Sequence, residues 1–134
     1  MLSNTIIDFI NGASGGFGLT KGVDLFAEQS RGDKHILVGV TTTTGDDYVP
    51  TLRKSGVNIL ITGWGVNDGF VLSTKIANKI LEMEGGTFTF NNGSQIETYE
   101  IGTIAVRTWP VSFNLLDKVV FTTNIEFHYK QTAA

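Results

Sequence analysis

Cysteine is absent from this 134-residue sequence, and proline occurs only twice. Without cysteine the chain can form no disulfide, no thiolate zinc site and no cysteine nucleophile. Runs of basic residues are also absent: the longest cluster is the pair Arg53 and Lys54, and the formal net charge is −3. The sequence therefore gives no sign of a basic surface of the kind that binds nucleic acid or an anionic membrane.

Long apolar stretches are absent too. No window approaches the roughly eighteen consecutive apolar residues that a membrane-spanning helix requires. The first residues, MLSNTIIDFING, have neither a basic leader nor a long apolar segment, so we expect a protein made in a cytoplasm, without a membrane partner. A hydrophobic content of 41% with 17% charged residues is typical of a globular chain. At this length we expect a single domain, residues 1–134.

Two segments have the apolar periodicity of amphipathic helices. The segment from Ser3 to Asn11 predicts a short helix in which Ser3 caps the N-terminus. A longer helix is expected to start at Asn67 or Asp68, either of which can act as the cap. It is expected to end at about Glu84, before two glycines.

Four runs rich in β-branched and aromatic residues predict strands, and NG at positions 92–93 predicts a tight hairpin turn. The runs are HILVGVTTTT (His35 to Thr44), VNILITGW (Val57 to Trp64), GTIAVRTW (Gly102 to Trp109) and VVFTTNIEFHYK (Val119 to Lys130). The last run alternates, which is typical of an antiparallel strand with one buried face. We therefore predict an α+β fold: a mainly antiparallel β-sheet of about four strands plus a β-hairpin, with two α-helices packed on one side.

A glycine-rich stretch, GGFGLTKG, raises the question of phosphate binding because Lys21 lies within it. A Walker phosphate loop follows a buried strand, leads into a helix and places Ser or Thr after its lysine. Here a helix is expected before the stretch, and Gly22 follows the lysine. We therefore interpret residues 12–22 as a flexible hinge. Residues 41–56 are predicted to form a long loop, and long loops are often functional.

Few residues in the sequence could carry catalysis. The only histidines, His35 and His128, have no third ligand at a recognisable spacing, so we interpret both as surface residues. The pair Asp46 and Asp47 lies in a glycine-containing turn, where aspartates are common without a bound cation. No G-x-S-x-G or H-E-x-x-H motif is present. We therefore predict a protein that is not an enzyme and has no catalytic, metal-binding or cofactor-binding residues.

Residues 109–118, WPVSFNLLDK, are predicted to connect two strands, yet they include Val111, Phe113, Leu115 and Leu116. Apolar side chains on a connection often mark a contact with another chain. They could equally fold back onto the edge of their own sheet. The sequence leaves both interpretations open.

The order of these elements resembles a known family. A helix containing IIDFING precedes the glycine-rich stretch and VDLFAE, and VNILITGWGVNDGFVLSTKIANKIL passes from a strand directly into a helix. NNG, a strand containing RTWP and a last strand ending in NIEFHYK follow. Over nearly its whole length the chain is similar to the minor capsid, tail-terminator and tail-to-head joining proteins of long-tailed bacteriophages (siphoviruses). The most specific part of the resemblance is the block from Val57 to Leu81.

The resemblance implies a structural virion protein of the tail and neck, which is assembled in the host cytoplasm. Proteins of this family form a ring, usually a hexamer, on the head-proximal end of the finished tail tube. The ring ends tail elongation and contacts the major tail-tube protein and the head connector or stopper protein. Phage DNA passes through its channel during genome ejection without specific binding, and an acidic chain suits such a channel. No cofactor is implied.

Other functions are compatible with the sequence. A head-side connector or stopper protein of the neck would have a similar size and composition. A small ligand-binding α+β domain, with a pocket between the helices and the sheet, belongs to a different class. An enzyme that uses His35, Asp46 and Asp47 is the remotest alternative.

A ring of this kind joins two different patches of neighbouring subunits, and we predict two contacts. The first is the loop that runs from Asp46 to Lys54, and the second is the apolar stretch near Phe113. The predicted interface residues are Asp46, Asp47, Tyr48, Arg53, Lys54, Phe113, Leu115 and Leu116.

In the first contact, Asp46 and Asp47 of one subunit lie opposite Arg53 and Lys54 of the next. Reversing both basic charges, in a variant that combines Arg53→Glu with Lys54→Glu, is expected to weaken assembly because like charges would then meet across the contact. Electron microscopy of rings on tail ends measures the effect. Unchanged ring formation would contradict this contact.

Overall fold

The structure is a computed structural model that describes residues 2–11, 17–29, 34–45, 52–91, 93–94, 96–115 and 118–133. Its elements, in chain order, are α1 (Leu2–Ile10), β1 (Leu25–Ala27), β2 (His35–Gly45), β3 (Leu52–Thr62), α3 (Val66–Leu81), β4 (Thr87–Asn91), β5 (Ile96–Leu115) and β6 (Lys118–Ala133). The strands form one sheet in the order β1-β2-β3-β6-β5-β4. In this sheet β1 and β2 are parallel, and the other neighbouring strands are antiparallel.

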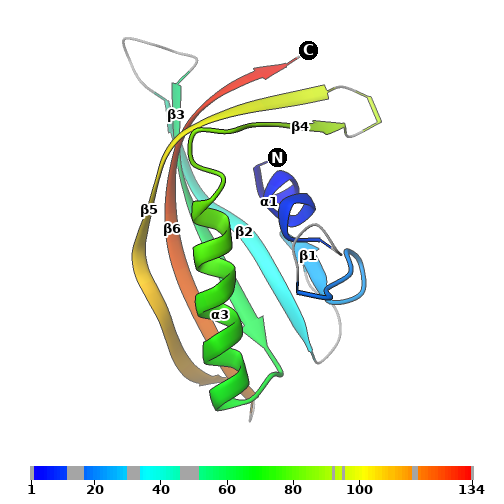
Figure 1. The fold of residues 1–134 in the computed structure, drawn as a ribbon, viewed down its shortest axis with the longest axis vertical. Coiled ribbons are helices and arrows are strands. Elements are labelled where there is room, and N and C mark those ends of the chain that lie inside the picture. Colours follow the sequence, from blue (N-terminus) through cyan, green and yellow to red (C-terminus); the bar gives the residue numbers. More distant parts are fainter. Residues whose placement is uncertain are drawn as a thin grey trace.

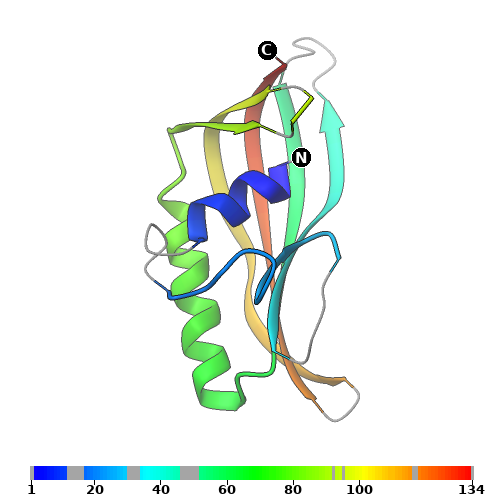
Figure 2. The same cartoon turned by 90° about the vertical axis from the view of Figure 1, so that its right-hand side faces the viewer.

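The sheet is strongly curved, and both helices lie on its concave side (Figure 1). Seen from that side, α3 runs roughly along the strands and α1 crosses them (Figure 2). The convex side carries no helix among the described residues, and we name it the helix-free face. Its side chains include Lys54, Asn58, Arg107, Thr122, Asn124, Glu126 and His128.

β6 lies in the middle of the sheet, and its alternating sequence decides which face is buried. Its odd-numbered residues from Phe121 to Tyr129 are at most 4% exposed, whereas Asn124 and His128 between them are exposed. This confirms the predicted one-sided strand. Val120 is the exception, because it is only 3% exposed although it falls on the polar side of the predicted pattern. Register then extends the same alternation to β3 and β5, which pair with β6 on its two sides.

The hydrophobic core fills the concave side. Buried isoleucines of α1 and α3 pack against buried aliphatic and aromatic side chains of the sheet, and each such side chain contributes about 1.5–3 kcal/mol through its burial. The core residues with no exposed area are Ile6, Ile7, Ile10, Leu25, Ile36, Val38, Ile76, Ala77, Ile80, Met83 and Phe127.

The ends of both helices differ from the prediction. α1 begins at Leu2, so Ser3 lies inside the helix, where its buried hydroxyl has no hydrogen-bond partner among the described residues, and the prediction of a Ser3 cap is wrong.

α3 ends at Leu81 and not at about Glu84. The helix begins after Gly65, whose φ is 79°, and no side chain caps it, so the prediction of a cap at Asn67 or Asp68 is wrong. Asp68 instead lies in the first turn, where its negative charge is favourable near the helix N-terminus. Beyond the C-terminal end, the N–H of Gly85 donates to the carbonyl oxygen of Ile101 at 3.0 Å, which ties this turn to β5.

The predicted fold class is wrong in its proportion of strand to helix and in its number of strands. The chain is mostly β, with a six-stranded mixed sheet curved like half a barrel, where we predicted about four mainly antiparallel strands plus a hairpin. β1 was not predicted, because it is only three residues long and forms only through parallel pairing with β2. The predicted hairpin is not separate, because β4 and β5 both belong to the main sheet.

Two strands are also longer than predicted. β5 has 20 residues and runs through the stretch from Trp109 to Leu115 that we predicted as a connection. Pro110 is tolerated there because β4 pairs with β5 only as far as Glu100, so this part of β5 is an edge. β3 begins at Leu52, so the predicted loop 41–56 is wrong at both ends; residues 46–51 lie outside the described residues.

The glycine-rich stretch is described only from residue 17 onward, so residues 12–16 of the predicted hinge lie outside the described part. The Lys21 ammonium donates to Asp8 Oδ1 at 3.0 Å, and its backbone N–H donates to Asn11 Oδ1 at 2.9 Å. The ammonium also lies 5.3 Å from the centre of the Phe90 ring. Lys21 therefore connects the segment after α1 to α1 and to β4.

Gly69 tests the packing of α3 on β6, because a Cβ there would lie 2.5 Å and 2.8 Å from ring carbons of the buried Phe121. Alanine favours a helix over glycine by about 1 kcal/mol, but overpacking a filled core costs about 1–3 kcal/mol. We expect Gly69→Ala to lower the free energy of unfolding in urea by about 1 kcal/mol. Adding Phe121→Leu should give a loss smaller than the sum of the two separate losses. A more stable Gly69→Ala variant would contradict the packing.

Candidate interaction surface

A polar network occupies the middle of the helix-free face, centred on Glu126 of β6. Glu126 Oε1 accepts hydrogen bonds from Arg107 Nη2 at 2.8 Å and interacts with His128 Nε2 at 2.8 Å. Its other oxygen, Oε2, lies 3.7 Å from Lys54 Nζ. The Glu126 side chain is 16% exposed, whereas those of Arg107 and Lys54 are 62% and 53% exposed. One carboxylate thus links basic side chains of three neighbouring strands.

This network lowers the pKa of Glu126 to about 2. The largest cause is the hydrogen bond from Arg107, followed by the hydrogen bond with His128, and both stabilise the ionised carboxylate. Nearby, the Asn58 amide donates to Thr122 Oγ1 at 2.7 Å and to Asn124 Oδ1 at 2.8 Å. Polar side chains are therefore paired across the strands of this face.

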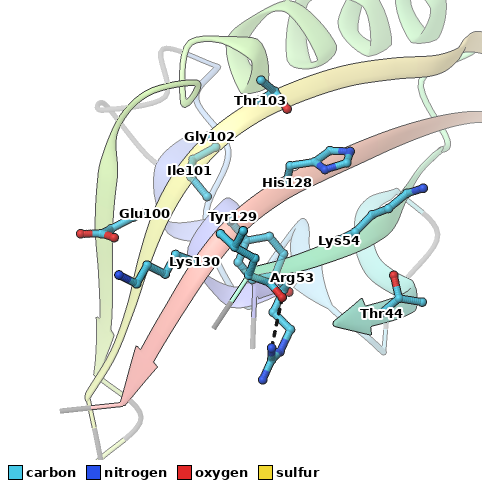
Figure 3. Close-up of a pocket in the computed structure, with 11 residues that line it drawn as sticks. Thr44, Arg53, Lys54, Glu100, Ile101, Gly102, Thr103, His128, Tyr129 and Lys130 are labelled. Carbon is cyan, nitrogen blue, oxygen red and sulfur yellow. Dashed lines mark hydrogen bonds between the residues drawn. The ribbon is translucent and has the colours of Figure 1, made fainter. Parts of the chain in front are cut away.

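A hollow of about 580 Å³ lies beside the network. Four neighbouring strands present Thr44, Lys54, His128 and Thr103 in a row at its wall, as their register requires (Figure 3). At Gly102 a register shift bends β5; a Cβ there would come within 3.1 Å of the His128 carbonyl oxygen. The hollow is lined by both signs of charge, since Glu100 and Lys130 also border it.

An apolar surface lies at the opposite end of the sheet, on the part of β5 that leads to the β5–β6 turn. We name Trp109, Val111 and Phe113 the apolar arm; they are 48%, 51% and 42% exposed. Val111 and Phe113 lie on the helix-free face, because they flank Ser112, which pairs with the core residue Phe121. The first two turns of α3 start at the same end of the molecule and expose Val66, Phe70 and Val71 (Figure 1).

The structure separates the two predicted contacts. Lys54 pairs with His128, and Phe113 pairs with Val120, eight residues away along β6. That spacing corresponds to roughly 26 Å along the strand. Arg53 Nη1 donates to the carbonyl oxygen of Leu52 at 3.1 Å (Figure 3).

The other predicted interface residues are described only in part. Asp46, Asp47, Tyr48 and Leu116 lie outside the described residues. The backbone of Leu115 pairs with Lys118 at the end of β5, and its side chain is not described. The prediction that these residues form subunit contacts therefore stays a prediction.

The Glu126 network was not found from the sequence. Its members come from β3, β5 and β6, and they meet only because of cross-strand register, for which the sequence carries no local signal. His128 is exposed, as predicted, whereas His35 is half-buried. The His35 ring packs edge-on against Phe26 at 6.4 Å, and His128 belongs to the network.

Comparison with protein-family models and with curated proteins finds no match to this chain. Within the described ranges, no group of three or more histidine, aspartate or glutamate side chains is placed to hold a metal ion. Neither described helix has the length and apolar content needed to cross a membrane.

Glu126→Gln tests the network. Because the folded-state pKa of Glu126 is lowered, its carboxylate stabilises the fold above its ordinary pKa of 4.5, and that stabilisation is lost as the pH falls toward about 2. We expect the variant to be less stable than the parent at pH 7, by a modest amount because the cations are largely exposed. The difference should shrink between about pH 4.5 and pH 2.

Urea denaturation at pH 7 and at about pH 2 measures this difference in stability. Glu84→Gln, an exposed change in the turn after α3, is the matched control. A stability difference that stays constant with pH, or equal stability at pH 7, would contradict the role of the carboxylate.

Proposed function

We propose that this chain is a structural virion protein that caps the head-proximal end of a phage tail tube as a ring, ends tail elongation and forms the head–tail joint. The resemblance of the strand-to-helix block supports this proposal, and β3 does run into α3 with only three residues between them. The proposal gives the chain no catalytic step. Its action depends on surfaces that bind other proteins.

The observation that carries the proposal is the apolar arm. Trp109, Val111 and Phe113 are large apolar side chains of one strand, each about half exposed. Val111 and Phe113 share the helix-free face, and Trp109 precedes them within the register shift between Thr108 and Val111. Solvent-exposed aromatic and aliphatic side chains that cluster in this way are typical of protein–protein contacts. The sequence left open whether these side chains fold back onto their own sheet. Their exposure favours a contact with another chain.

The ligand-binding alternative is less well supported. Its pocket was expected between the helices and the sheet, where the side chains of Ile6, Ile80 and Phe127 are fully buried. A hollow on that side, between α1 and β4, has a volume of only about 260 Å³. Ligand pockets usually enclose about 300–1,000 Å³. The hollow of about 580 Å³ lies instead on the helix-free face.

Electron microscopy of lysates from a phage lacking this gene, with complementation as the control, tests the proposal. We expect filled heads without tails beside free tubes of uncontrolled length. Tails of normal length that fail to attach would move the function to a head-side connector or stopper. Normal infectious virions would contradict both roles and favour the ligand-binding alternative.

The apolar arm can be tested separately by a variant that combines Val111→Asp with Phe113→Asp. Two carboxylates would have to be desolvated in the contact, so we expect complementation to fall by about a hundredfold or more. Asn114→Asp, an exposed change on the same strand, is the matched control and should complement normally. Circular dichroism checks that both variants fold. Full complementation by the folded double variant would exclude the arm as the contact.

A further inference from the structure

The exposed edge segments of the sheet differ in how they are protected against pairing with another chain. Exposed strand edges are templates for pairing with another chain, and proteins usually block them with charge, proline or bulges. The outer edge of β5 beyond Glu100 carries all three, namely Arg107, Pro110 and register irregularities between residues 101 and 111. Two other edge segments, one on β2 and one on β4, have neither charge nor proline, and the segment on β2 has one register shift, between Val40 and Thr42.

The open edge of β2 starts where β1 leaves it. β1 pairs with β2 only from Ile36 to Val38. Glu28 then takes a left-handed conformation, with φ of 68°, and its Oε1 accepts a hydrogen bond from the Val40 N–H at 3.0 Å. The chain turns away at this point, so β2 from Thr41 to Gly45 has a strand partner on one side only within the described residues.

That segment reads TTTTG. Its threonines are exposed, uncharged and β-branched, which suits a strand. In an antiparallel pair every second residue directs its N–H and C=O away from the partner. The pairing of β2 with β3 therefore leaves backbone donors and acceptors of residues 41–45 directed outward.

The open edge of β4 lies on the other side of the sheet. β4 reads TFTFN and pairs only with β5 among the described residues. Phe88 is fixed edge-to-face against Phe9 at 5.4 Å, and the Lys21 ammonium lies over Phe90, so both rings face the concave side. The core thus holds β4 in place while its outer edge stays free. Both open edges lie toward the same end of the molecule (Figure 2).

We infer that β4 of one copy pairs with the β2 edge of the next copy, so that the sheet continues from subunit to subunit. The occupant is a second copy because one chain supplies both halves of the contact, each five residues long. Successive antiparallel pairings from β2 to β4 give these two strands the same direction, so copies related by rotation would pair them in parallel. Such a contact is heterologous and can close into a ring. The inference rests on the proposed function.

Engineered cysteines test this contact cleanly, because the chain has none of its own. Thr42, Thr44 and Thr89 lie on the helix-free face, since they fall in register with Glu126, His128 and Thr132. Neighbouring strands bring such residues within the Cα separation of about 4.4–6.8 Å that a disulfide needs. Two double variants, Thr42→Cys with Thr89→Cys and Thr44→Cys with Thr89→Cys, cover the two nearest registers.

Purified tails are oxidised and run on a non-reducing gel. We expect at least one double variant to give a ladder of covalent oligomers, and the single variants to give none. Thr103→Cys with Thr89→Cys, which uses the protected β5 edge on the same helix-free face, is the matched control and should give no ladder. Normal tails without a ladder from either double variant would overturn the edge contact and leave the proposed function intact. A covalent product with a different virion protein would also overturn it.

A second variant does not depend on cross-linking. Thr42→Lys places a charge on the open edge, the device by which other edges are blocked, and should reduce complementation by about tenfold or more while the chain stays folded. Thr132→Lys, a change of the same kind on β6, where Thr132 pairs with Thr98 of β5 outside both proposed edge segments, is the control and should complement normally. Full complementation by Thr42→Lys would overturn the inference, whatever the outcome of gene deletion.

Discussion

β6 pairs with β3 on one side and with β5 on the other along almost its whole length, and its apolar side chains alternate with polar ones. Because strand register couples the faces of neighbouring strands, this alternation makes one side of the sheet apolar throughout its centre. α1 and α3 cover that side and fill it with buried isoleucines. The curvature of the sheet, the position of both helices and the polarity of the helix-free face all depend on this one-sided burial.

Both helices pack on the concave side, and the surfaces that we propose as contacts with other chains belong to the sheet. The helix-free face is polar in its middle, where Glu126 links Arg107, His128 and Lys54, and apolar at the end that carries Val111. In the middle of this face, the charged side chains of the network pair with one another within the chain. The apolar arm stays exposed and, among the described residues, the open edges of β2 and β4 keep unpaired backbone groups, so we propose these surfaces as contacts with other chains.

The sequence predicts the elements whose pattern is local. The alternation of β6 and the periodicity of both helices were read correctly, although α3 begins at Val66 without the expected side-chain cap. Features that depend on distant pairing were missed: β1 exists through its register with Ile36, and the 20-residue β5 continues through Pro110 because β6 supports it. Val111 and Phe113 of the arm were identified from the sequence, and Trp109 was not. The Glu126 network needs three strands in register before it can be seen.

A high-resolution reconstruction of the head–tail joint of intact virions by electron cryomicroscopy tests the central claim most directly, namely that this chain works through its apolar arm at the tail end. The account predicts a ring of this chain in which Trp109, Val111 and Phe113 are buried against another protein chain. A ring in which these side chains stay as exposed as in the isolated chain, where they are 42–51% exposed, would contradict the account.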